Sequence, residues 1–316
     1  MNTTRTTFND GESRRRRRAA LSDNPLPAYT VVGGKERGGD TGLSAILLNR
    51  GSRYPRRSLF AELEKAGFDA IVSIELSVET YDLDALSTQF PSVTFILLPG
   101  SLNVGCQINI AASEVKGPLF FVLWNDLKFL YGGCAAKIVE RLLVPFDKAA
   151  EGAAYGGAAK TRMFKRFCTV PVFQNPDFEA LPTASNPVLI KKTLELAPST
   201  PEKEDAPTLY PYDAVGVYDK QRFLELGGFD RGMRNEYWQL LDLGFRAWLW
   251  GEEIRCTQFI RLRHEGPIKI EDSSADESKR RFTLKNLSPV LRYDAETTGL
   301  YAHLPLRSLW RFLSQA

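Results

Sequence analysis

The carboxylate of Asp126 is the first group in this sequence whose position suggests chemistry. It follows an apolar run, 118–124, that stops at polar residues and predicts a buried strand. In open α/β sheets the ligand crevice lies just beyond the carboxyl ends of the strands, so we expect Asp126 at the mouth of such a crevice. Asn125 and Asp126 are also ordinary turn residues, and a turn without chemistry is the alternative interpretation.

Apolar runs alternate with helical patterns along the part of the chain that must position Asp126. The runs predict strands at 43–48, 70–76, 93–98 and 118–124. Between them, apolar residues at helical spacing predict helices that start at Pro55, near Leu83 and at Val104. This alternation is typical of a mostly parallel sheet flanked by helices. The predicted fold class is therefore α/β, with a single main domain.

The second half of the chain is patterned less regularly. Helices are predicted over 135–143 and from Asn235 to Gly251, and strands at 214–218 and 254–262. Residues 151–160 give a weak strand-and-turn signal. The segment 174–210, which contains six prolines, predicts a long irregular loop. A terminal helix of mixed character is expected at 304–313.

The charge of the chain is concentrated at its start. Five positive charges form the run 14–18, and without that run the net charge of +3 becomes slightly acidic. Nucleic acid is therefore not an expected partner. Residues 1–40 hold few apolar side chains and predict a disordered basic tail. Its arginine run could contact an anionic membrane surface or nucleic acid, and a solvated tail without function is the alternative.

Cysteine and histidine usage argues against a zinc finger or a disulfide framework. The four cysteines show no C-x-x-C pairing, and the histidines are His264 and His303. No apolar run approaches the roughly 18 residues of a membrane span, and no apolar region follows the arginine run as in a signal peptide. We expect a cytoplasmic protein with reduced cysteines.

Two stretches of the chain, taken together, resemble the inverting family-2 glycosyltransferases with the GT-A fold. The first has a strand ending at Asn49 and Arg50, a strand carrying Glu75, an N-x-G helix start at Asn103 and Gly105, and Trp124-Asn125-Asp126 in place of the D-x-D metal motif. The second has Gly227-Gly-Phe-Asp230, Asp242-Leu-Gly-Phe-Arg246, and a strand that leads to His264. The resemblance covers roughly residues 43–266.

The resemblance implies transfer of a sugar from a UDP- or GDP-linked donor to a hydroxyl of a glycan, lipid-linked or protein acceptor. It implies Mg²⁺ or Mn²⁺ on the diphosphate, held by Asp126 and His264. The residues expected to contact the donor are Asn49, Arg50, Glu75, Asn103, Gly105 and Asn125. On this basis 41–130 is a nucleotide-binding half, 131–270 an acceptor half, and 271–316 a C-terminal extension.

The sequence departs from the family pattern at two positions that matter for mechanism. Trp124 stands where the first D-x-D carboxylate is expected, and the family's E-D pair falls on Gln239-Leu240. Glu236, one turn earlier, is the candidate base, with a helix-dipole role as the alternative. Asp242 is a second catalytic candidate, and its alternative is an ion pair with Arg246.

Two other interpretations remain open at this stage. His264 could be a buried, hydrogen-bonded histidine rather than a metal ligand. The degraded motifs also suit a non-catalytic GT-A protein that binds a nucleotide sugar, a glycan or a partner enzyme. A nucleotidyltransferase is a third possibility, but it should carry a Gly-rich basic loop after the first strand, and residues 49–53 only faintly resemble one.

Overall fold

The computed structural model describes residues 26–34, 38–50, 56–76, 83–143, 164, 166–190 and 193–287. The arginine run 14–18, the weak signal at 151–160 and the helix expected at 304–313 lie outside these ranges. None of the helices within them is both long and apolar enough to cross a bilayer.

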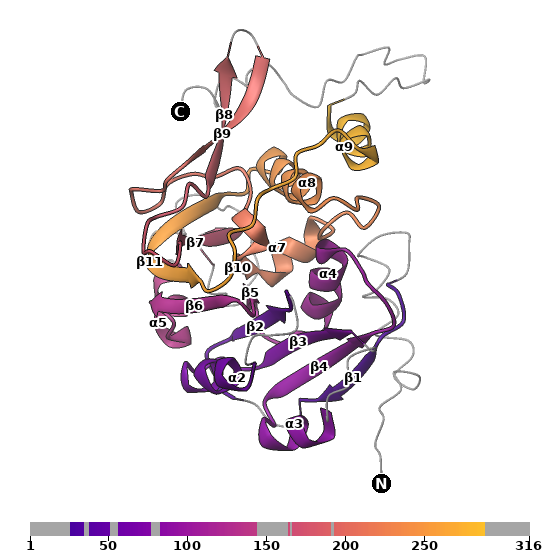
Figure 1. The fold of residues 1–316 in the computed structure, drawn as a ribbon, viewed down its shortest axis with the longest axis vertical. Coiled ribbons are helices and arrows are strands. Elements are labelled where there is room, and N and C mark those ends of the chain that lie inside the picture. Colours follow the sequence, from indigo (N-terminus) through magenta and orange to yellow (C-terminus); the bar gives the residue numbers. More distant parts are fainter. Residues whose placement is uncertain are drawn as a thin grey trace, which may run out of the picture.

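A nine-stranded mixed sheet forms the centre of the molecule, with the strand order β1-β4-β3-β2-β5-β10-β7-β11-β6 (Figure 1). Its strands are β1 (Thr30–Gly33), β2 (Leu43–Leu48), β3 (Ile71–Leu76), β4 (Val93–Leu98), β5 (Leu119–Trp124), β6 (Leu127–Tyr131), β7 (Cys168–Gln174), β10 (Gly216–Asp219) and β11 (Ile254–His264). A separate hairpin pairs β8 (Ala184–Ile190) with β9 (Thr193–Ser199).

Most of the central strands run in one direction, which confirms the predicted α/β class. Strand β2 pairs in parallel with β3 and β5, β3 with β4, and β7 with β11. Strands β1, β6 and β10 run against their neighbours. The carboxyl ends of β2, β5 and β11 therefore lie along the same edge of the sheet.

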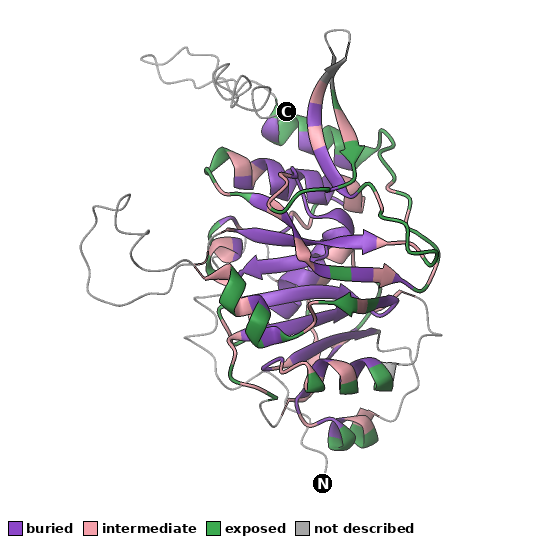
Figure 2. Ribbon diagram, turned by 90° about the vertical axis from the view of Figure 1, so that its left-hand side faces the viewer, coloured by how far each residue is buried: buried purple, intermediate pink, exposed green. Residues whose placement is uncertain are grey.

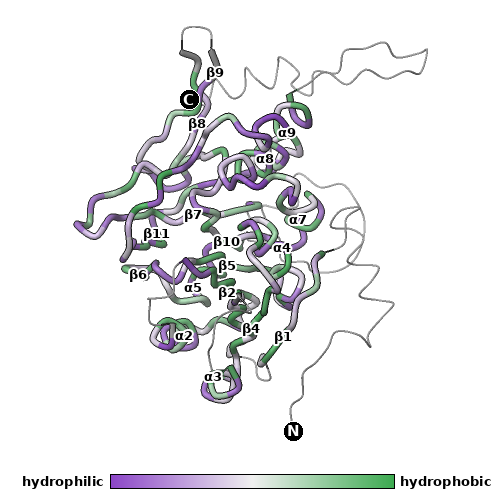
Figure 3. The backbone as a smooth tube through the Cα atoms, turned by 45° about the vertical axis from the view of Figure 1, so that its right-hand side comes forward, coloured by the Kyte–Doolittle hydropathy of each residue, from purple (hydrophilic) through white to green (hydrophobic). Residues whose placement is uncertain are grey.

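Helices cover the sheet (Figure 2). They are α2 (Arg56–Lys65), α3 (Leu83–Gln89), α4 (Val104–Glu114), α5 (Ala135–Leu142), the short η1 (Tyr212–Ala214), α7 (Lys220–Glu225), α8 (Glu236–Leu249) and α9 (Glu277–Asn286). Helices α2, α3, α5 and α9 carry exposed residues on their outer sides, whereas no residue of α4 is exposed (Figure 2). Every residue of β2 and β5 is buried. The residues of the central strands are mostly hydrophobic, whereas α2, α3 and α9 mix hydrophobic and hydrophilic residues (Figure 3). This pattern is the one expected for strands that are buried on both faces.

Two expectations from the sequence are corrected. Thr30–Gly33 form the edge strand β1, so this part of the expected disordered tail belongs to the sheet. The segment 174–210 contains the β8–β9 hairpin rather than only irregular loop. Both were hard to see because β1 is only partly buried and the hairpin contains Pro187 and Pro198. Strand β6, directly after Asp126, was missed because most of its residues are not buried.

Helices α4 and α8 meet through a polar contact rather than an apolar one. The backbone N–H of Gly105 donates to Gln239 Oε1 at 3.1 Å, and Gln239 Nε2 donates to Asn103 Oδ1 at 2.9 Å. Asn109 holds both backbone groups of Phe229, because its Oδ1 accepts from Phe229 N–H at 2.9 Å and its Nδ2 donates to Phe229 O at 2.8 Å. The amide side chains therefore fix the 228–233 loop and the start of α8 against α4.

Replacing Gly105 with alanine would place a Cβ 2.5 Å from the Cβ of Phe229. We expect the free energy of unfolding, measured in urea, to fall by about 1–3 kcal/mol. Alanine favours a helix over glycine by only about 1 kcal/mol, which does not offset this overlap. Gly100→Ala is the control, because a Cβ there meets nothing within 4 Å. A Gly105→Ala variant as stable as the wild type would contradict this packing.

Candidate functional site

The ends of β2 and β5 are joined through polar groups at the carboxyl edge of the sheet. Asn125 Oδ1 accepts a hydrogen bond from the backbone N–H of Arg50 at 2.8 Å. The amide of Asn125 in turn donates its backbone N–H to Leu48 O at 3.0 Å. These contacts place Arg50, Asn125 and Asp126 together at one edge of the sheet.

Arg50 binds two buried aspartates. Its Nη2 lies 2.6 Å and 2.8 Å from the two carboxylate oxygens of Asp213, and its Nη1 lies 3.4 Å from Asp126 Oδ2. Both aspartate side chains are at most 1% exposed, whereas that of Arg50 is 25% exposed. Burial alone would lower the pKa of Arg50, but Asp213, Asp126 and Glu236 together raise that pKa above its ordinary value. The guanidinium is therefore a fixed positive charge.

Trp124 organises this group of charges. Its indole N–H donates to the backbone oxygen of Asp213 at 2.9 Å. The guanidinium carbon of Arg50 lies 4.0 Å from the Trp124 ring centroid, and the Lys269 ammonium lies 5.8 Å from it. Cations over an indole face are attracted by its π electrons. Trp124, which stands at the first position of the expected D-x-D motif, therefore lies against two side-chain cations.

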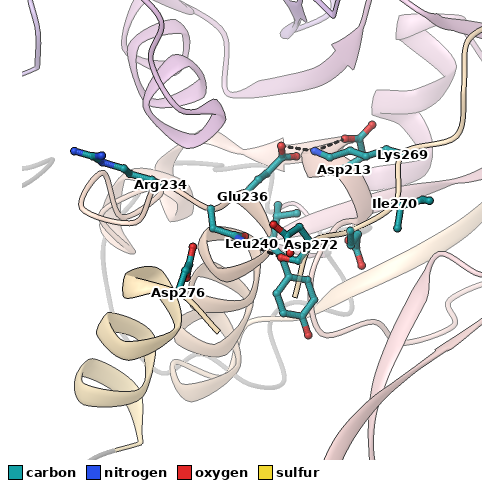
Figure 4. A pocket seen from close by; sticks show the side chains of 11 residues that line it. Asp213, Arg234, Glu236, Leu240, Lys269, Ile270, Asp272 and Asp276 are labelled. Atoms are coloured by element: carbon teal, nitrogen blue, oxygen red, sulfur yellow. Dashed lines mark hydrogen bonds and ion pairs between the residues drawn. The ribbon is translucent and has the colours of Figure 1, made fainter. Parts of the chain in front are cut away.

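A cavity of about 360 Å³ opens beside this group and is lined by residues of α8 and of the segment after β11 (Figure 4). Lys269 lies between Asp213 and Glu236, with its Nζ 3.2 Å from Asp213 Oδ1 and in an ion pair with Glu236 Oε2. Glu271 lines the same cavity and accepts from Tyr210 Oη at 2.8 Å. The cavity wall therefore combines an ammonium with several carboxylates.

Glu236 is the first residue of α8, and the helix start fixes its position. Asn235 caps the helix, and its Nδ2 donates to Asp272 O at 2.9 Å. The second oxygen of Glu236, Oε1, is buried and has no hydrogen-bond partner among the described residues. Burial, reinforced by Asp213, raises the pKa of Glu236 above its ordinary value despite Lys269 and Arg50. A carboxylate with a raised pKa and an oxygen that has no hydrogen-bond partner is suited to accept a proton.

Asp126 and His264 offer only an incomplete metal site. Asp126 Oδ1 and both ring nitrogens of His264 are buried without a hydrogen-bond partner among the described residues. His264 stacks on Phe173 with ring centroids 5.6 Å apart, and burial lowers its pKa, so the ring is neutral. Within the described ranges, however, no three His, Cys, Asp or Glu side chains gather closely enough to hold a metal. The other Asp126 oxygen faces Arg50.

The residues expected to contact the nucleoside lie at the end of β3. Glu75 is buried and accepts from Ser73 Oγ at 2.8 Å. Asn49 donates its side-chain amide to Ile74 O and lies 3.5 Å from Glu75 Oε1. Both are near the predicted crevice, but these contacts are also those of a strand-end turn, and their role toward a nucleoside stays a prediction.

Asn103 and Gly105 have structural partners of their own. Asn103 caps α4 by accepting from Cys106 N–H at 2.8 Å, and its Nδ2 donates to Arg231 O at 3.2 Å and to Met233 O at 3.1 Å. Gly105 is buried beneath Phe229 and Gln239. The N-x-G pattern therefore serves the α4–α8 contact, and donor binding by these two residues stays a prediction.

Asp242 forms the ion pair expected for its helix position. Its Oδ2 accepts from Arg246 Nε at 2.9 Å, and its Oδ1 accepts from Asn286 Nδ2 at 2.8 Å. Lys285 Nζ completes the group at 3.0 Å. Asp242 is fully buried and is not among the residues that line the cavity. The geometry favours its structural alternative, in which it ties α8 to α9.

Sequence reasoning missed Asp213 and Lys269, the two residues that join Arg50 to Glu236. Asp213 and Ala214 both have positive φ, 55° and 60°, an uncommon backbone for residues other than glycine. Such conformations persist where the surroundings impose them, and they concentrate at functional sites. Neither Asp213 nor Lys269 lies in a periodic pattern or a motif of the sequence. The charge of Lys269 in the segment after β11 is the one signal that the sequence offered.

Comparison with known proteins relates the chain to others through its structure alone. No protein-family model matches the sequence, and no curated protein matches it. The structure superposes on Staphylococcus aureus TarS with a TM-score of 0.53 and 12% identity, over 86% of this chain and 43% of TarS. The chain has the GT-A fold. Its architecture therefore resembles that of nucleotide-sugar glycosyltransferases.

Two ligand-bound structures superpose at lower scores. The structure of S. aureus TarS 1–349 in complex with UDP-GlcNAc superposes with a TM-score of 0.49 and 14% identity, over 86% of this chain and 72% of that one. The structure of GalNAc-T7 with UDP, GalNAc and Mn²⁺ superposes with a TM-score of 0.48 and 13% identity, over 86% of this chain and 54% of that one. This GT-A chain spans about half the length of GalNAc-T7 and less than half of TarS.

Asp230, at the end of the Gly227–Asp230 turn, should make the stability of the fold depend on pH. Burial alone would raise the pKa of Asp230, but Arg281, Lys285 and the N–H of Gly232 lower it to about 2. Because the folded pKa lies below the unfolded value of 3.8, this carboxylate stabilises the fold above about pH 4, and the contribution is lost as the pH falls toward 2. Relative to Asp230→Asn, we expect the wild type to be about 1–2 kcal/mol more stable at neutral pH.

Urea unfolding of both proteins between about pH 3 and 7 measures this difference. Asp177→Asn, at an exposed turn position, should keep the wild-type dependence on pH. If the stability of Asp230→Asn decreased as steeply as that of the wild type when the pH is lowered, the ion pairs of Asp230 with Arg281 and Lys285 would not contribute to the free energy of unfolding.

Proposed function

We propose that this protein is a glycosyltransferase that moves a sugar from a UDP- or GDP-linked donor to an acceptor hydroxyl, with inversion at the anomeric carbon. The observation that carries the proposal is Glu236, which lines a cavity beside the carboxyl edge of the sheet and whose buried Oε1 has no hydrogen-bond partner among the described residues. In α/β folds this edge is where ligands bind. The TarS and GalNAc-T7 structures hold UDP-GlcNAc, and UDP with GalNAc, respectively, which supports a UDP-linked donor here.

The reaction uses Glu236 as the general base. Its Oε1 takes the proton of the acceptor hydroxyl as the oxygen attacks the anomeric carbon, and the bond from that carbon to the diphosphate breaks with the electron pair on the leaving phosphate. Lys269 holds the other oxygen of Glu236 and so fixes the direction of the base. Positioning of this kind lowers the barrier by making attack effectively intramolecular.

The cavity provides the acceptor side of the reaction. Tyr237, Leu240 and Ile270 line it together with the carboxylates of Asp272 and Asp276. Ile270 is 90% exposed, so its side chain is available to an acceptor that enters from solvent. A glycan or glycosylated lipid or protein would place its hydroxyl on Glu236 and its ring faces against the apolar residues.

The divalent metal expected from the resemblance does not fit these residues well. Asp126 and His264 would be its ligands and Mg²⁺ or Mn²⁺ its identity, as Mn²⁺ is in the GalNAc-T7 structure. Trp124 cannot bind a metal, and Arg50 already faces one oxygen of Asp126. No step of the proposed reaction is therefore assigned to a metal.

Glu236→Gln tests the role of the base. The amide keeps the shape and can still contact Lys269, but it cannot take a proton at neutral pH. We expect kcat to fall by about 10²–10⁴ while donor binding is retained. The measurement is sugar transfer or donor hydrolysis with the full chain, with donor affinity from calorimetry.

Glu277→Gln is the matched control, because Glu277 is also a first-turn acid, on α9, and is 78% exposed. It should leave turnover unchanged. Turnover of Glu236→Gln within a few-fold of the wild type would exclude Glu236 as the base. A wild type that binds a nucleotide sugar but turns over none of the acceptors or water would favour the non-catalytic binding protein instead.

A further inference from the structure

The diphosphate of a nucleotide sugar needs positive charge at its binding site, and this structure supplies that charge from side chains. Arg50 and Lys269 come from opposite ends of the described chain, one after β2 and one after β11. Both contact Asp213, at 2.6 Å and 3.2 Å, and both lie over the ring of Trp124. The two cations therefore converge on Asp213. Asp213 and Lys269 both line the cavity (Figure 4).

Both cations keep donors for a ligand. Arg50 uses Nη2 on Asp213 and Nη1 on Asp126, and Lys269 bonds to Asp213 and Glu236. A guanidinium and an ammonium each carry more N–H groups than these contacts use. Each side chain is 25% exposed, so solvent, and hence a phosphate oxygen, reaches it. Charge-assisted hydrogen bonds of this kind are the strong ones in phosphate recognition.

The same residues are poorly arranged for a divalent metal. Asp126 already faces Arg50, and Asp213 faces both Arg50 and Lys269, so each aspartate has a side-chain cation as its partner. Asp126 Oδ1 and the His264 nitrogens remain open, but they fall short of three ligands within the described part of the chain. Trp124 favours a side-chain cation over a metal ion at this position.

We propose that Arg50 and Lys269, held over Trp124, bind the diphosphate of the donor and neutralise it in place of a divalent metal. The inference rests on the proposed function, because it concerns the donor of that reaction. It makes the donor site independent of metal and assigns Trp124 a role in positioning the two cations. On departure of the diphosphate, its new negative charge is met by these two side chains.

Calorimetric titration of the full chain with UDP, GDP and UDP-GlcNAc, once with EDTA and once with Mn²⁺, tests the proposal. We expect one nucleotide to bind equally in both conditions. Arg50→Gln and Lys269→Gln should each weaken that binding by about tenfold or more, since each removes a charge-assisted contact. Lys269→Arg keeps the positive charge, so its affinity for the nucleotide should fall much less than that of Lys269→Gln.

Arg255→Gln is the matched control. Arg255 has a similar exposure of 23% and an ion pair with Glu253 at 2.9 Å, but it lies at the start of β11, away from the cavity. It should bind the nucleotide as the wild type does, and circular dichroism with thermal unfolding should show that each variant is folded. If Arg50→Gln is unstable, Arg50→Lys keeps a charge without the planar contact and should bind more weakly than the wild type.

The outcomes separate this inference from the proposed function. Binding that appears only with Mn²⁺, or that tightens tenfold with it, would overturn the metal-free site and leave a glycosyltransferase intact. Binding in EDTA that neither Arg50→Gln nor Lys269→Gln weakens would overturn the role of these cations alone. A folded wild type that binds none of the nucleotides in either condition would overturn the proposed function and this inference with it.

Discussion

The contact between Trp124 and Asp213 is the one on which the rest of this site depends. The indole N–H holds the backbone oxygen of Asp213, whose φ of 55° would otherwise be unfavourable. In that position the buried carboxylate receives Arg50 from one side and Lys269 from the other. A buried aspartate without these partners would be costly, so the three side chains constrain one another. Lys269, fixed in this way, fixes Glu236.

The second constraint is the contact of α4 with α8, which determines where Glu236 begins its helix. Gln239 reaches from α8 to Gly105 and Asn103, and Asn109 holds the loop that leads to α8. Asp242 then ties the middle of α8 to α9 through Lys285 and Asn286. Asn103, Gly105 and Asp242, which match family motifs in the sequence, therefore hold α8 in place. Glu236, the first residue of α8, is one of several acids that line the cavity.

The sequence predicted the parts of the fold whose physics is local. Strands β2, β3, β4 and β5 read as apolar runs because strands inside a parallel sheet are buried on both faces. Glu236 became the candidate base because it lies one turn before the place where the resemblance puts the E-D pair, and the N-cap Asn235 placed it at the start of that helix. Asp213 and Lys269 could not be found in this way, since their positions follow from contacts between segments distant in the chain. Strand β6 escaped because an edge strand need not be apolar.

The replacement of a motif residue need not mean the loss of a function. A carboxylate in the first D-x-D position would repel the phosphates and so would need a metal between them. An indole there carries no charge, and its face attracts the same cations that phosphates attract. In the proposed donor site, Trp124 therefore favours side-chain cations where a carboxylate would favour a metal. Arg50 and Lys269 are both held by Asp213, and this is the arrangement of cations that the proposed donor site needs.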